Sequence, residues 1–545
     1  MVGQPGAGDR VLPQLGAAES EDPESRFSVR EVTRREWMAS LPAMASAAGT
    51  PATGGLSFNE DSSHFFTSRN GKRLTLADVD GWVEQYAGTQ VRELILNVNA
   101  MRTSYASKVW DPIWRGYDPN GPDDQPLMAS LTPEGRTSAR KWIHAAWQLH
   151  EDGIDLYARW IAQARKHKLS PWVSMRMNDI HNVDDEKAYI HSEFWRAHPE
   201  YRRVPYRFAG WPDRAFDYGR QEVREYHLKL VRELAERYDF DGLELDWMRF
   251  GYHFRPGHER EGAELLTAFT AEVRRILDGW QMKRGHRIRL GARVASRPES
   301  ALGLGMDAVE WARRGLVDFL VITPFWATIE PDMPVEQWKT LLRGTNVTLA
   351  AGLELLLRAH PGEKPYQKNS LETVRGAAAA LLDRGADRVY LFNYMDSETA
   401  IDNLADNARI LREAGSLTTL AGKPRRHVVT YPDTWAPGEP QAIALPQTIG
   451  KGQWRAFRVP IGPLPASGKA EVRLGVEGSD AREWKVLVNG EPSTFASDTK
   501  PEKPHSPAPM FRFRAPFTSL RRGYNVVEIE ATESGGRIVW VELAL

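Results

Sequence analysis

Short apolar runs alternate with helical patterns from residue 74 to about residue 415 of this chain. The runs are rich in β-branched and aliphatic residues, and the segments between them repeat apolar residues at helical spacing. Such alternation is typical of parallel strands joined by crossover helices. Seven strands are predicted, at residues 91–99, 170–178, 240–248, 287–294, 317–325, 347–355 and 387–395, and an eighth, shorter one is expected at residues 214–219.

Eight strand–helix units predict an α/β fold, a (β/α)8 TIM barrel over residues 70–415. A doubly wound open sheet is the alternative, and it is disfavoured because no glycine-rich phosphate loop follows any strand. The loops at residues 100–150 and 179–213 follow the first two strands and carry many aromatic, His, Arg and Asp residues. Because loops after strands build the active face of a TIM barrel, we expect the functional site there.

Beyond residue 424 the helical pattern ends, and short segments alternate polar and apolar residues between turns. This pattern predicts an all-β sandwich over residues 424–545. The sandwich is interpreted either as a carbohydrate-binding module or as a domain that packs on the barrel.

The first 60 residues differ from the rest, being polar and rich in Gly, Pro and Glu at their start, which predicts a disordered tail at residues 1–60. Residues 33–50 contain Arg34 and Arg35 followed by a short Ala-rich run, which resembles a twin-arginine export signal. A periplasmic or extracellular protein is therefore expected, although the segment begins far from residue 1 and an ordinary basic helix is the alternative.

Composition excludes several classes of protein. The formal net charge of −1 gives no global field to attract nucleic acid or an acidic membrane. The absence of cysteine excludes disulfides and thiolate metal sites, and no apolar stretch is long enough to span a membrane. The 19 tryptophans pack the core or serve as platforms on which sugar rings stack. The sequence says nothing of the oligomeric state.

The segment YDFDGLELDWMRF, residues 238–250, places acids in an apolar strand. Alternation puts Leu243, Leu245 and Trp247 on one face and Glu244 and Asp246 on the other. In a barrel the apolar face packs on helices, so both acids point into the lumen, with Asp246 nearer the mouth. Buried acids are either paired with arginine or used in chemistry, and glycoside hydrolysis needs two carboxylates.

The same segment resembles the fourth-strand signature of glycosidase-type TIM barrels, most closely the glycosyl-hydrolase-like family 10 barrels. It is similar, more distantly, to chitinase barrels with a D-G-x-D-x-D-x-E strand. Met248 stands where the terminal acid of that chitinase strand would be, which argues against a substrate-assisted chitinase mechanism. The resemblance covers about residues 90–400 and implies that Asp246 is the leading catalytic residue; it implies no particular substrate.

A second acid is expected on an opposing strand. Glu354 ends the run LAAGLEL and is the candidate acid/base, with Asp246 as nucleophile or base and Glu244 as a further catalytic candidate. An acid that pairs with arginine is the alternative for Glu354. Asp179, Asp396 and Glu330 are the other acids considered for the role.

Polar and aromatic residues at strand ends and in loops complete the predicted site. Arginines there either bind an anionic sugar or pair with the acids, and amides can bridge sugar hydroxyls. The spacings H-x-H and H-E-x-x-H are absent, so no metal and no cofactor is expected. The residues predicted to contact substrate are Asn99, Arg102, Tyr105, Trp110, Arg176, Asp179, Arg249, Arg293, Trp326, Tyr394 and Asp396.

Three hypotheses follow for function. The first is an exported glycoside hydrolase that acts on a poly- or oligosaccharide, including an anionic one, as its carbohydrate partner. The second is a glycan-binding protein without activity. The third is a polysaccharide lyase, which would use a base such as Tyr105 together with Arg102. Release of reducing ends would support the first hypothesis, binding without turnover the second, and an unsaturated product the third.

Overall fold

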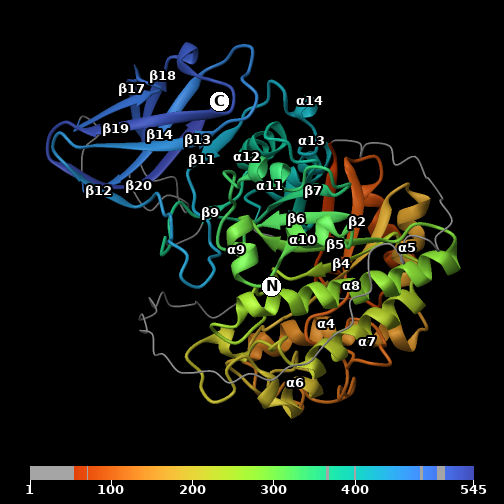
Figure 1. The fold of residues 1–545 in the computed structure, drawn as a ribbon. Coiled ribbons are helices and arrows are strands. Elements are labelled where there is room, and N and C mark those ends of the chain that lie inside the picture. Colours follow the sequence, from red (N-terminus) through yellow and green to blue (C-terminus); the bar gives the residue numbers. More distant parts are fainter. Residues whose placement is uncertain (1–53, 70–71, 364–366, 398–400, 479–482, 500–509) are drawn as a thin grey trace, which may run out of the picture. The chain divides into compact units, whose positions relative to one another are not determined.

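A closed barrel of eight parallel strands forms the centre of the protein (Figure 1). The computed structural model describes residues 54–69, 72–363, 367–397, 401–478, 483–499 and 510–545. Around the barrel the strands follow their order in the sequence. They are β1 (Leu56–Glu60), β2 (Val91–Asn97), β3 (Ser170–Arg176), β4 (Gly242–Asp246), β5 (Arg289–Ala295), β6 (Phe319–Thr323), β7 (Thr348–Leu353) and β10 (Arg388–Phe392).

All seven of the stronger strand predictions are confirmed, and so is the TIM-barrel fold. The prediction of a strand at residues 214–219 is wrong. Phe216 makes a single bridge to Arg202, and the segment follows a 3-10 helix at Trp211–Arg214. The eighth strand is β1, which lies within the segment expected to be a tail. The predicted twin-arginine segment at residues 33–50 lies outside the described residues.

The strand β1 is short, and Leu56 and Phe58 are its only apolar residues. On one side β1 pairs with β10, so that Ser57 lies beside Tyr390 and Asn59 beside Phe392. On its other side β1 pairs with β2. Ser57 and Asn59 therefore share the inward face with those two rings, while Leu56 and Phe58 face the surrounding helices. Because the inward positions are polar, the strand reads as a turn-like segment in the sequence.

The barrel interior is divided into an apolar layer and a polar layer. The apolar side chains form a cluster separate from the main core: Ile95, Trp172, Phe319, Val321, Ala350, Tyr390 and Phe392. Gly242 leaves room for Trp172, because a Cβ there would lie 2.3 Å from the indole ring. Glu244 and Asp246 lie on the same inward face, nearer the carboxyl ends of the strands, as the alternation predicts.

Helices of varied length surround the barrel (Figure 1). Their ends carry ordinary signals: Thr75 and Ser370 begin helices with capping boxes, and α8 ends at Gly285 with a left-handed backbone. The helices are α2 (His64–Ser68), α3 (Leu76–Trp82), α4 (Pro133–Glu151), α5 (Leu156–Lys166), α6 (Glu193–Ala197), α7 (Gln221–Arg237), α8 (Glu259–Arg284), α9 (Pro298–Gly303), α10 (Ala308–Arg313), α11 (Val335–Leu341), α12 (Leu371–Asp383), α13 (Asn407–Glu413) and α14 (Leu417–Leu420).

The C-terminal part is all β, with antiparallel pairs in two sheets. One sheet has the order β11-β20-β14-β18-β17, with β12 also paired to β20, and the other has the order β13-β19-β15-β16. Its strands are β11 (Arg426–Val428), β12 (Gln447–Gly450), β13 (Trp454–Pro460), β14 (Ala470–Glu477), β15 (Trp484–Val488), β16 (Glu491–Pro492), β17 (Thr494–Thr499), β18 (Met510–Ala515), β19 (Tyr524–Ala531) and β20 (Gly535–Ala544). A further hairpin, β8 (Leu356–Leu357) with β9 (Gln367–Lys368), follows β7.

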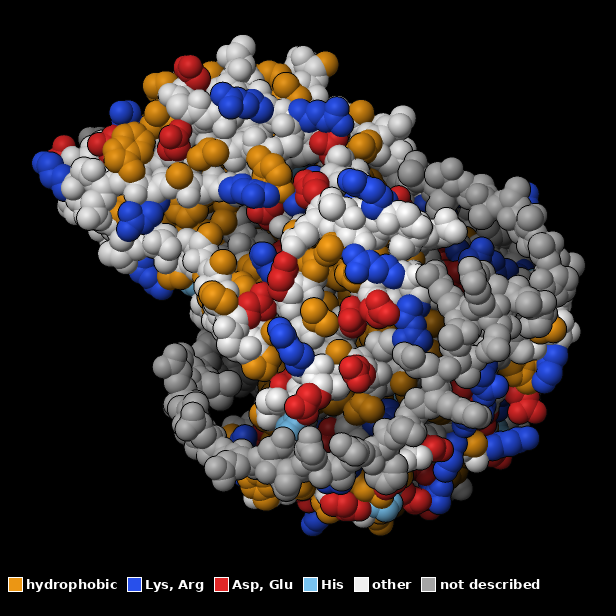
Figure 2. Space-filling model, viewed as in Figure 1, with side chains coloured by type: hydrophobic (Ala, Val, Ile, Leu, Met, Phe, Trp, Pro, Cys, Tyr) orange, Lys and Arg blue, Asp and Glu red, His pale blue; other side chains and the backbone are white. Residues whose placement is uncertain are grey.

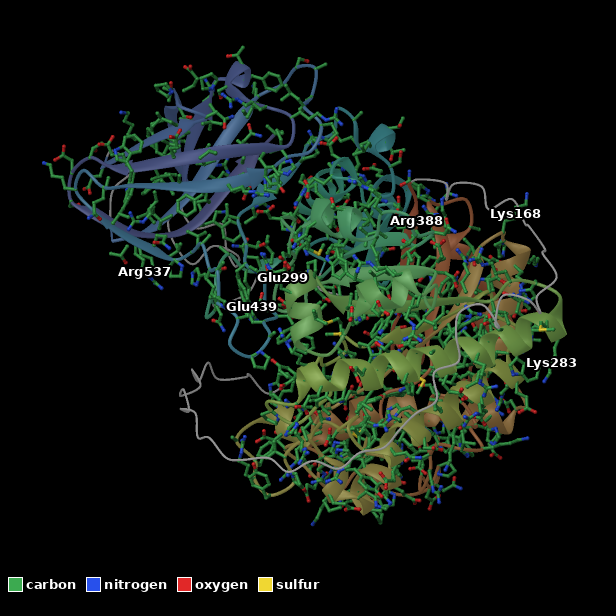
Figure 3. The ribbon with its side chains drawn as sticks, viewed as in Figure 1. Lys168, Lys283, Glu299, Arg388, Glu439 and Arg537 are labelled. Carbon is green, nitrogen blue, oxygen red and sulfur yellow. The ribbon has the colours of Figure 1, made fainter. Side chains whose placement is uncertain are left out.

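The C-terminal part contacts helices α12 and α9 of the barrel. A Cβ at Gly376 of α12 would lie 2.0 Å from the carbonyl oxygen of Arg426 in β11. Ser300 of α9 donates its hydroxyl to Glu439, whose position beside α9 is labelled in Figure 3. The two parts therefore share a packed boundary.

Surface charge is mixed. Basic and acidic side chains are interspersed on the face seen in Figure 2, in keeping with the net charge of −1. Within the described ranges, none of the helices has the length and apolar character that a membrane span requires.

We predict that Gly376→Ala lowers the free energy of unfolding by about 1–3 kcal/mol, because the new methyl group would overlap backbone that cannot easily move. The matched control is Gly279→Ala in α8, where a Cβ meets nothing within 4 Å. That change should stabilise the helix by about 0.5–1 kcal/mol. Thermal unfolding of both variants tests this; equal midpoints would contradict the packed boundary.

Candidate active site

Asp246 occupies the last position of β4 and is fully buried. Its Oδ1 accepts the backbone N–H groups of Met248 (3.1 Å) and Arg249 (2.9 Å), and its Oδ2 accepts Nη1–H of Arg293 (2.7 Å). Three donors, one of them a cation, form the environment of an ionised carboxylate. The two backbone bonds also turn the chain sharply, and Phe250 follows with φ of 68°, a strained conformation for a bulky residue.

The Arg293 guanidinium links Asp246 to a second acid. Besides its bond to Asp246, its Nη2 lies 3.6 Å from Oε1 of Glu354. The side chain of Arg293 is fully buried, and its guanidinium lies over the ring of Phe392, 3.8 Å from the centroid. A cation that is stacked on a ring, bonded to the Asp246 carboxylate and close to a second carboxyl group is held in one position.

Glu354 follows β7 directly and continues its inward face, as expected. Its backbone carbonyl accepts the amide of Asn369 (2.6 Å) and the hydroxyl of Tyr394 (2.8 Å), which fix the chain at this point. The carboxyl group itself is buried, and burial raises its pKa well above the ordinary range despite the opposing charge of Arg293. Burial therefore favours the protonated form of Glu354.

Glu244 lies one layer deeper in the lumen. Its Oε1 accepts the hydroxyls of Ser174 (2.7 Å) and Tyr390 (2.9 Å). Burial, and then the negative charge of Asp246, raise the pKa of Glu244 to about 7. The structure thus brings together the three acids that the sequence singled out, Glu244, Asp246 and Glu354, around Arg293.

The acids are more enclosed than an open cleft requires. Asp246 is 0% exposed and Glu354 3% exposed. Rings from three loops meet next to Arg249: Trp211 lies 5.5 Å from Phe250 and 5.9 Å from Phe325 between ring centroids. These rings pack on one another.

A second ion-pair group lies at the ends of β1 and β3. Arg176 bonds Asp179 (Nη1 to Oδ2, 3.0 Å) and also Asp61. Burial opposes ionisation of these acids, but Arg176 and the other partners hold the pKa of both Asp61 and Asp179 well below the usual range. His181 continues the group, since its Nδ1 lies 2.7 Å from Oδ1 of Asp179.

Arg249 joins this group to Asp246. Its Nη2 donates to Nε2 of His181 (2.7 Å), while its backbone N–H bonds Asp246. Burial, together with the nearby cation Arg176, lowers the pKa of Arg249 to about 10. Both arginines therefore interact with groups of the protein, Arg176 with two acids and Arg249 with an imidazole.

Asp433 comes from the C-terminal segment and was not identified from the sequence. Its carboxylate accepts three successive backbone N–H groups of the loop after β6: Phe325 (2.7 Å), Trp326 (2.9 Å) and Ala327 (2.7 Å). This arrangement fixes Trp326, one of the predicted substrate contacts. The only sequence signal was an acid in a Pro-rich segment, which cannot indicate so distant a partner.

Three predicted contacts lie away from the acids. Tyr105 donates to Glu233 of α7 (2.8 Å), and Trp110 stacks on Tyr226 of the same helix with centroids 4.4 Å apart. Arg102 donates to the backbone carbonyls of residues 191 and 115. These three side chains fix the long loop after β2.

Two further predicted contacts, Asn99 and Asp396, are held by other parts of the mouth. The Asn99 side chain bonds both backbone groups of Arg176. Asp396 pairs with Arg69 and lies 3.4 Å from Nε2 of His64. Asp396 is therefore one acid of a separate polar group beside β1.

Asn59 of β1 and Asn97 of β2 both face the lumen. Both amide atoms of Asn59, and Oδ1 of Asn97, are buried without a hydrogen-bond partner in the described structure. The same holds for Nη2 of Arg293 and Oε1 of Glu354. Recognising β1 as a strand would have indicated Asn59 and Asp61. Across the described ranges, no group of three or more His, Asp or Glu side chains is arranged to hold a metal ion.

Comparisons with known proteins add only distant likenesses. The chain matches no protein-family model and no curated protein sequence. Among solved structures it is similar to a cycloisomaltooligosaccharide glucanotransferase of Paenibacillus sp. (8% identity, 91% of this chain and 58% of that chain, TM-score 0.33). It is also similar to an alpha-L-fucosidase of Paenibacillus thiaminolyticus (12%, 62% and 45%, 0.37) and an alpha-amylase of Anoxybacillus (11%, 88% and 98%, 0.34).

The chain spans less than two thirds of the length of the first two of these structures. Likenesses with such identities and TM-scores carry no argument about activity or substrate.

The raised pKa of Glu244 predicts how stability depends on pH. The unfolded chain releases this proton near the ordinary value of 4.5, whereas the folded protein keeps it up to about pH 7. The stabilisation is complete below pH 4.5 and is lost as pH rises to 7, by roughly 3 kcal/mol. Glu244→Gln keeps the acceptor for Ser174 and Tyr390 and removes the titration.

Urea unfolding of wild type and Glu244→Gln between pH 4.5 and 7.5 measures the effect. The difference in unfolding free energy between the two proteins should change across this range, with wild type losing more stability as pH rises. Parallel curves would show that Glu244 titrates alike in both states.

Proposed function

We propose that the chain is a glycoside hydrolase, in which Asp246 acts as nucleophile or base and Glu354 as the general acid. The observation that carries the proposal is the Arg293 guanidinium, which joins a hydrogen-bonded carboxylate to a buried carboxyl group at the carboxyl ends of β4 and β7. Two carboxyl groups in unlike environments divide the roles of acid and base between them.

The division of charge supports these roles. Glu354 has a raised pKa and so holds a proton that a glycosidic oxygen can receive. Asp246 accepts hydrogen bonds from three N–H groups, one of them from a cation, and so offers negative charge to the sugar ring. Neither residue needs a metal or cofactor for this chemistry.

The position of Arg293 bears on stereochemistry. A guanidinium stands between the two carboxyl groups, and two strands, β5 and β6, separate β4 from β7 around the barrel. This arrangement favours the longer carboxyl separation of inverting enzymes, roughly 6.5–9.5 Å, over the shorter one of retaining enzymes. We therefore infer inversion at the anomeric carbon.

A neutral glycan fits the site better than an anionic one. Arg176 pairs with Asp61 and Asp179, and Arg293 pairs with Asp246 and Glu354. An anionic sugar would have to compete with the carboxylates of Asp61, Asp179 and Asp246. The buried amide of Asn59, which has no partner among the described residues, offers a donor and an acceptor suited to a sugar hydroxyl.

A glycan-binding protein without activity is the second candidate, and the burial of Asp246 favours it. Its carboxylate has three donors and no exposed surface, as a structural acid would. The lyase hypothesis gains no support, because Tyr105 and Arg102 each bond other parts of the chain. Export through the twin-arginine segment at residues 33–50 and glycan binding by the C-terminal sandwich both remain part of the proposal.

The decisive experiment compares two variants on two kinds of substrate. Purified protein is first screened on neutral and charged glycans for release of reducing ends. Glu354→Gln should then lower kcat/KM on the glycan by about 10²–10⁴-fold but change hydrolysis of the matching p-nitrophenyl glycoside far less, since that leaving group needs no proton. Asp246→Asn should abolish both activities.

Glu363→Gln serves as the matched control. Glu363 is another buried glutamate, and burial raises its pKa to about 7, but it bonds the backbone of Ala359 in a loop after β7. Its replacement should leave both activities near wild type. Binding of glycan with no turnover by wild type on any substrate would establish the second candidate instead.

A further inference from the structure

Ser397 joins two residues from the other end of the chain, Glu60 and His64, in a series of hydrogen-bond contacts beside the barrel mouth. His64 Nε2 lies 2.9 Å from Oγ of Ser397, and His64 Nδ1 lies 2.6 Å from Oε1 of Glu60. The order is hydroxyl, imidazole and carboxylate, with each contact at hydrogen-bond distance. This is the arrangement of a nucleophile, a base and the group that orients the base.

The three residues come from different elements. Glu60 ends β1, His64 begins α2, and Ser397 lies in the loop after β10, the strand that pairs with β1. Glu60 is 1% exposed and His64 3% exposed, whereas Ser397 is partly exposed. The imidazole and carboxylate are thus shielded from water, whereas the serine residue is exposed in part.

The hydrogen bonds permit the tautomer that catalysis needs. With its proton on Nδ1, His64 donates to Glu60, and its Nε2 accepts the Ser397 hydroxyl. Asp396 offers the hydroxyl a second acceptor at 3.2 Å, but the oxygens of Asp396 also bind the guanidinium of Arg69. The contact to the imidazole is the shorter of the two.

We propose that Ser397, His64 and Glu60 form a second catalytic centre, which hydrolyses esters of small carboxylic acids. Ser397 is the nucleophile, His64 the general base and acid, and Glu60 the residue that orients the imidazole. This centre is independent of Asp246 and Glu354, which lie on the inward face of the barrel, and it does not depend on the glycosidase proposal.

The reaction balances with water as the co-reactant. Ser397 Oγ attacks the ester carbonyl carbon while its proton passes to His64 Nε2. The bond from that carbon to the alkoxy oxygen then breaks, and the leaving alcohol takes the proton from His64. Water attacks the resulting acyl-serine, His64 accepts a proton from the water and returns it to Ser397, and the carboxylic acid leaves.

The alternative is that His64 only ties the loop after β10 to β1. A structural contact of that kind would leave Ser397 as unreactive as any surface serine. A reactive serine, in contrast, is acylated or phosphonylated in the folded protein and loses this reactivity when its base is misoriented. Chemical labelling therefore separates the two readings without knowledge of the natural ester.

The experiment treats the full-length protein with a fluorophosphonate probe and with p-nitrophenyl acetate. Mass spectrometry should place the phosphonyl adduct on Ser397. Ser397→Ala should abolish the adduct and lower the rate of acetate release to that of free solution. Glu60→Gln should lower kcat for p-nitrophenyl acetate by about 100-fold or more with a smaller change in KM, because the carboxylate orients the base.

Ser416→Ala is the matched control, since Ser416 is also partly exposed and caps the short helix α14 without an imidazole partner. It should keep the adduct and the esterase rate. An adduct at another serine, or none at all in folded wild type, would overturn the proposal. This outcome would be visible without any variant, so a misfolded mutant cannot obscure it.

Discussion

The fully buried guanidinium of Arg293 is the interaction on which the candidate site depends. It lies between the carboxyl groups of Asp246 and Glu354 and against the ring of Phe392. A buried cation of this kind is stable only while its partners are present, and removal of one partner from such a pair typically destabilises a protein by about 3–5 kcal/mol. The barrel therefore fixes the relative positions of the two acids through one side chain.

The surroundings of this side chain extend the same constraint outward. Asp246 turns the chain after β4 through two backbone N–H bonds, which places Arg249 beside His181. Asp433, from the C-terminal segment, accepts hydrogen bonds from backbone N–H groups of the loop after β6. Hydrogen bonds thus tie Asp246 to the loop after β4, and a separate set ties the loop after β6 to the C-terminal segment.

The fold could be predicted from the sequence where strands are apolar and long, and the failure at β1 has a physical reason. Its inward positions, Ser57 and Asn59, are polar because they lie in the lumen near the site, so the strand lacks an apolar run. Residues 214–219 looked like a strand because Phe216 and Tyr218 alternate, but both rings are buried against His227 of α7.

The candidate site, too, could be predicted from the sequence only in part. The inward direction of Glu244 and Asp246 follows from alternation within one strand, and the structure agrees. The contact of Arg293 with Glu354, the bonds of Asp433, and the contact of His64 with Ser397 join residues that only the closed barrel and its C-terminal extension bring together. No local pattern can carry such pairings, since each depends on the order of strands around the barrel.

The protonation of Glu354 beside Arg293 is the central claim, and infrared difference spectroscopy tests it most directly. Spectra of wild type, Glu354→Gln and Asp246→Asn are compared at pH 7 in the region of the protonated carboxyl stretch. The account predicts that Glu354→Gln removes a protonated-carboxyl band and that Asp246→Asn instead removes carboxylate absorption. An unchanged carboxyl band in Glu354→Gln, with loss of carboxylate absorption, would show that Glu354 is ionised and would contradict its assignment as the acid.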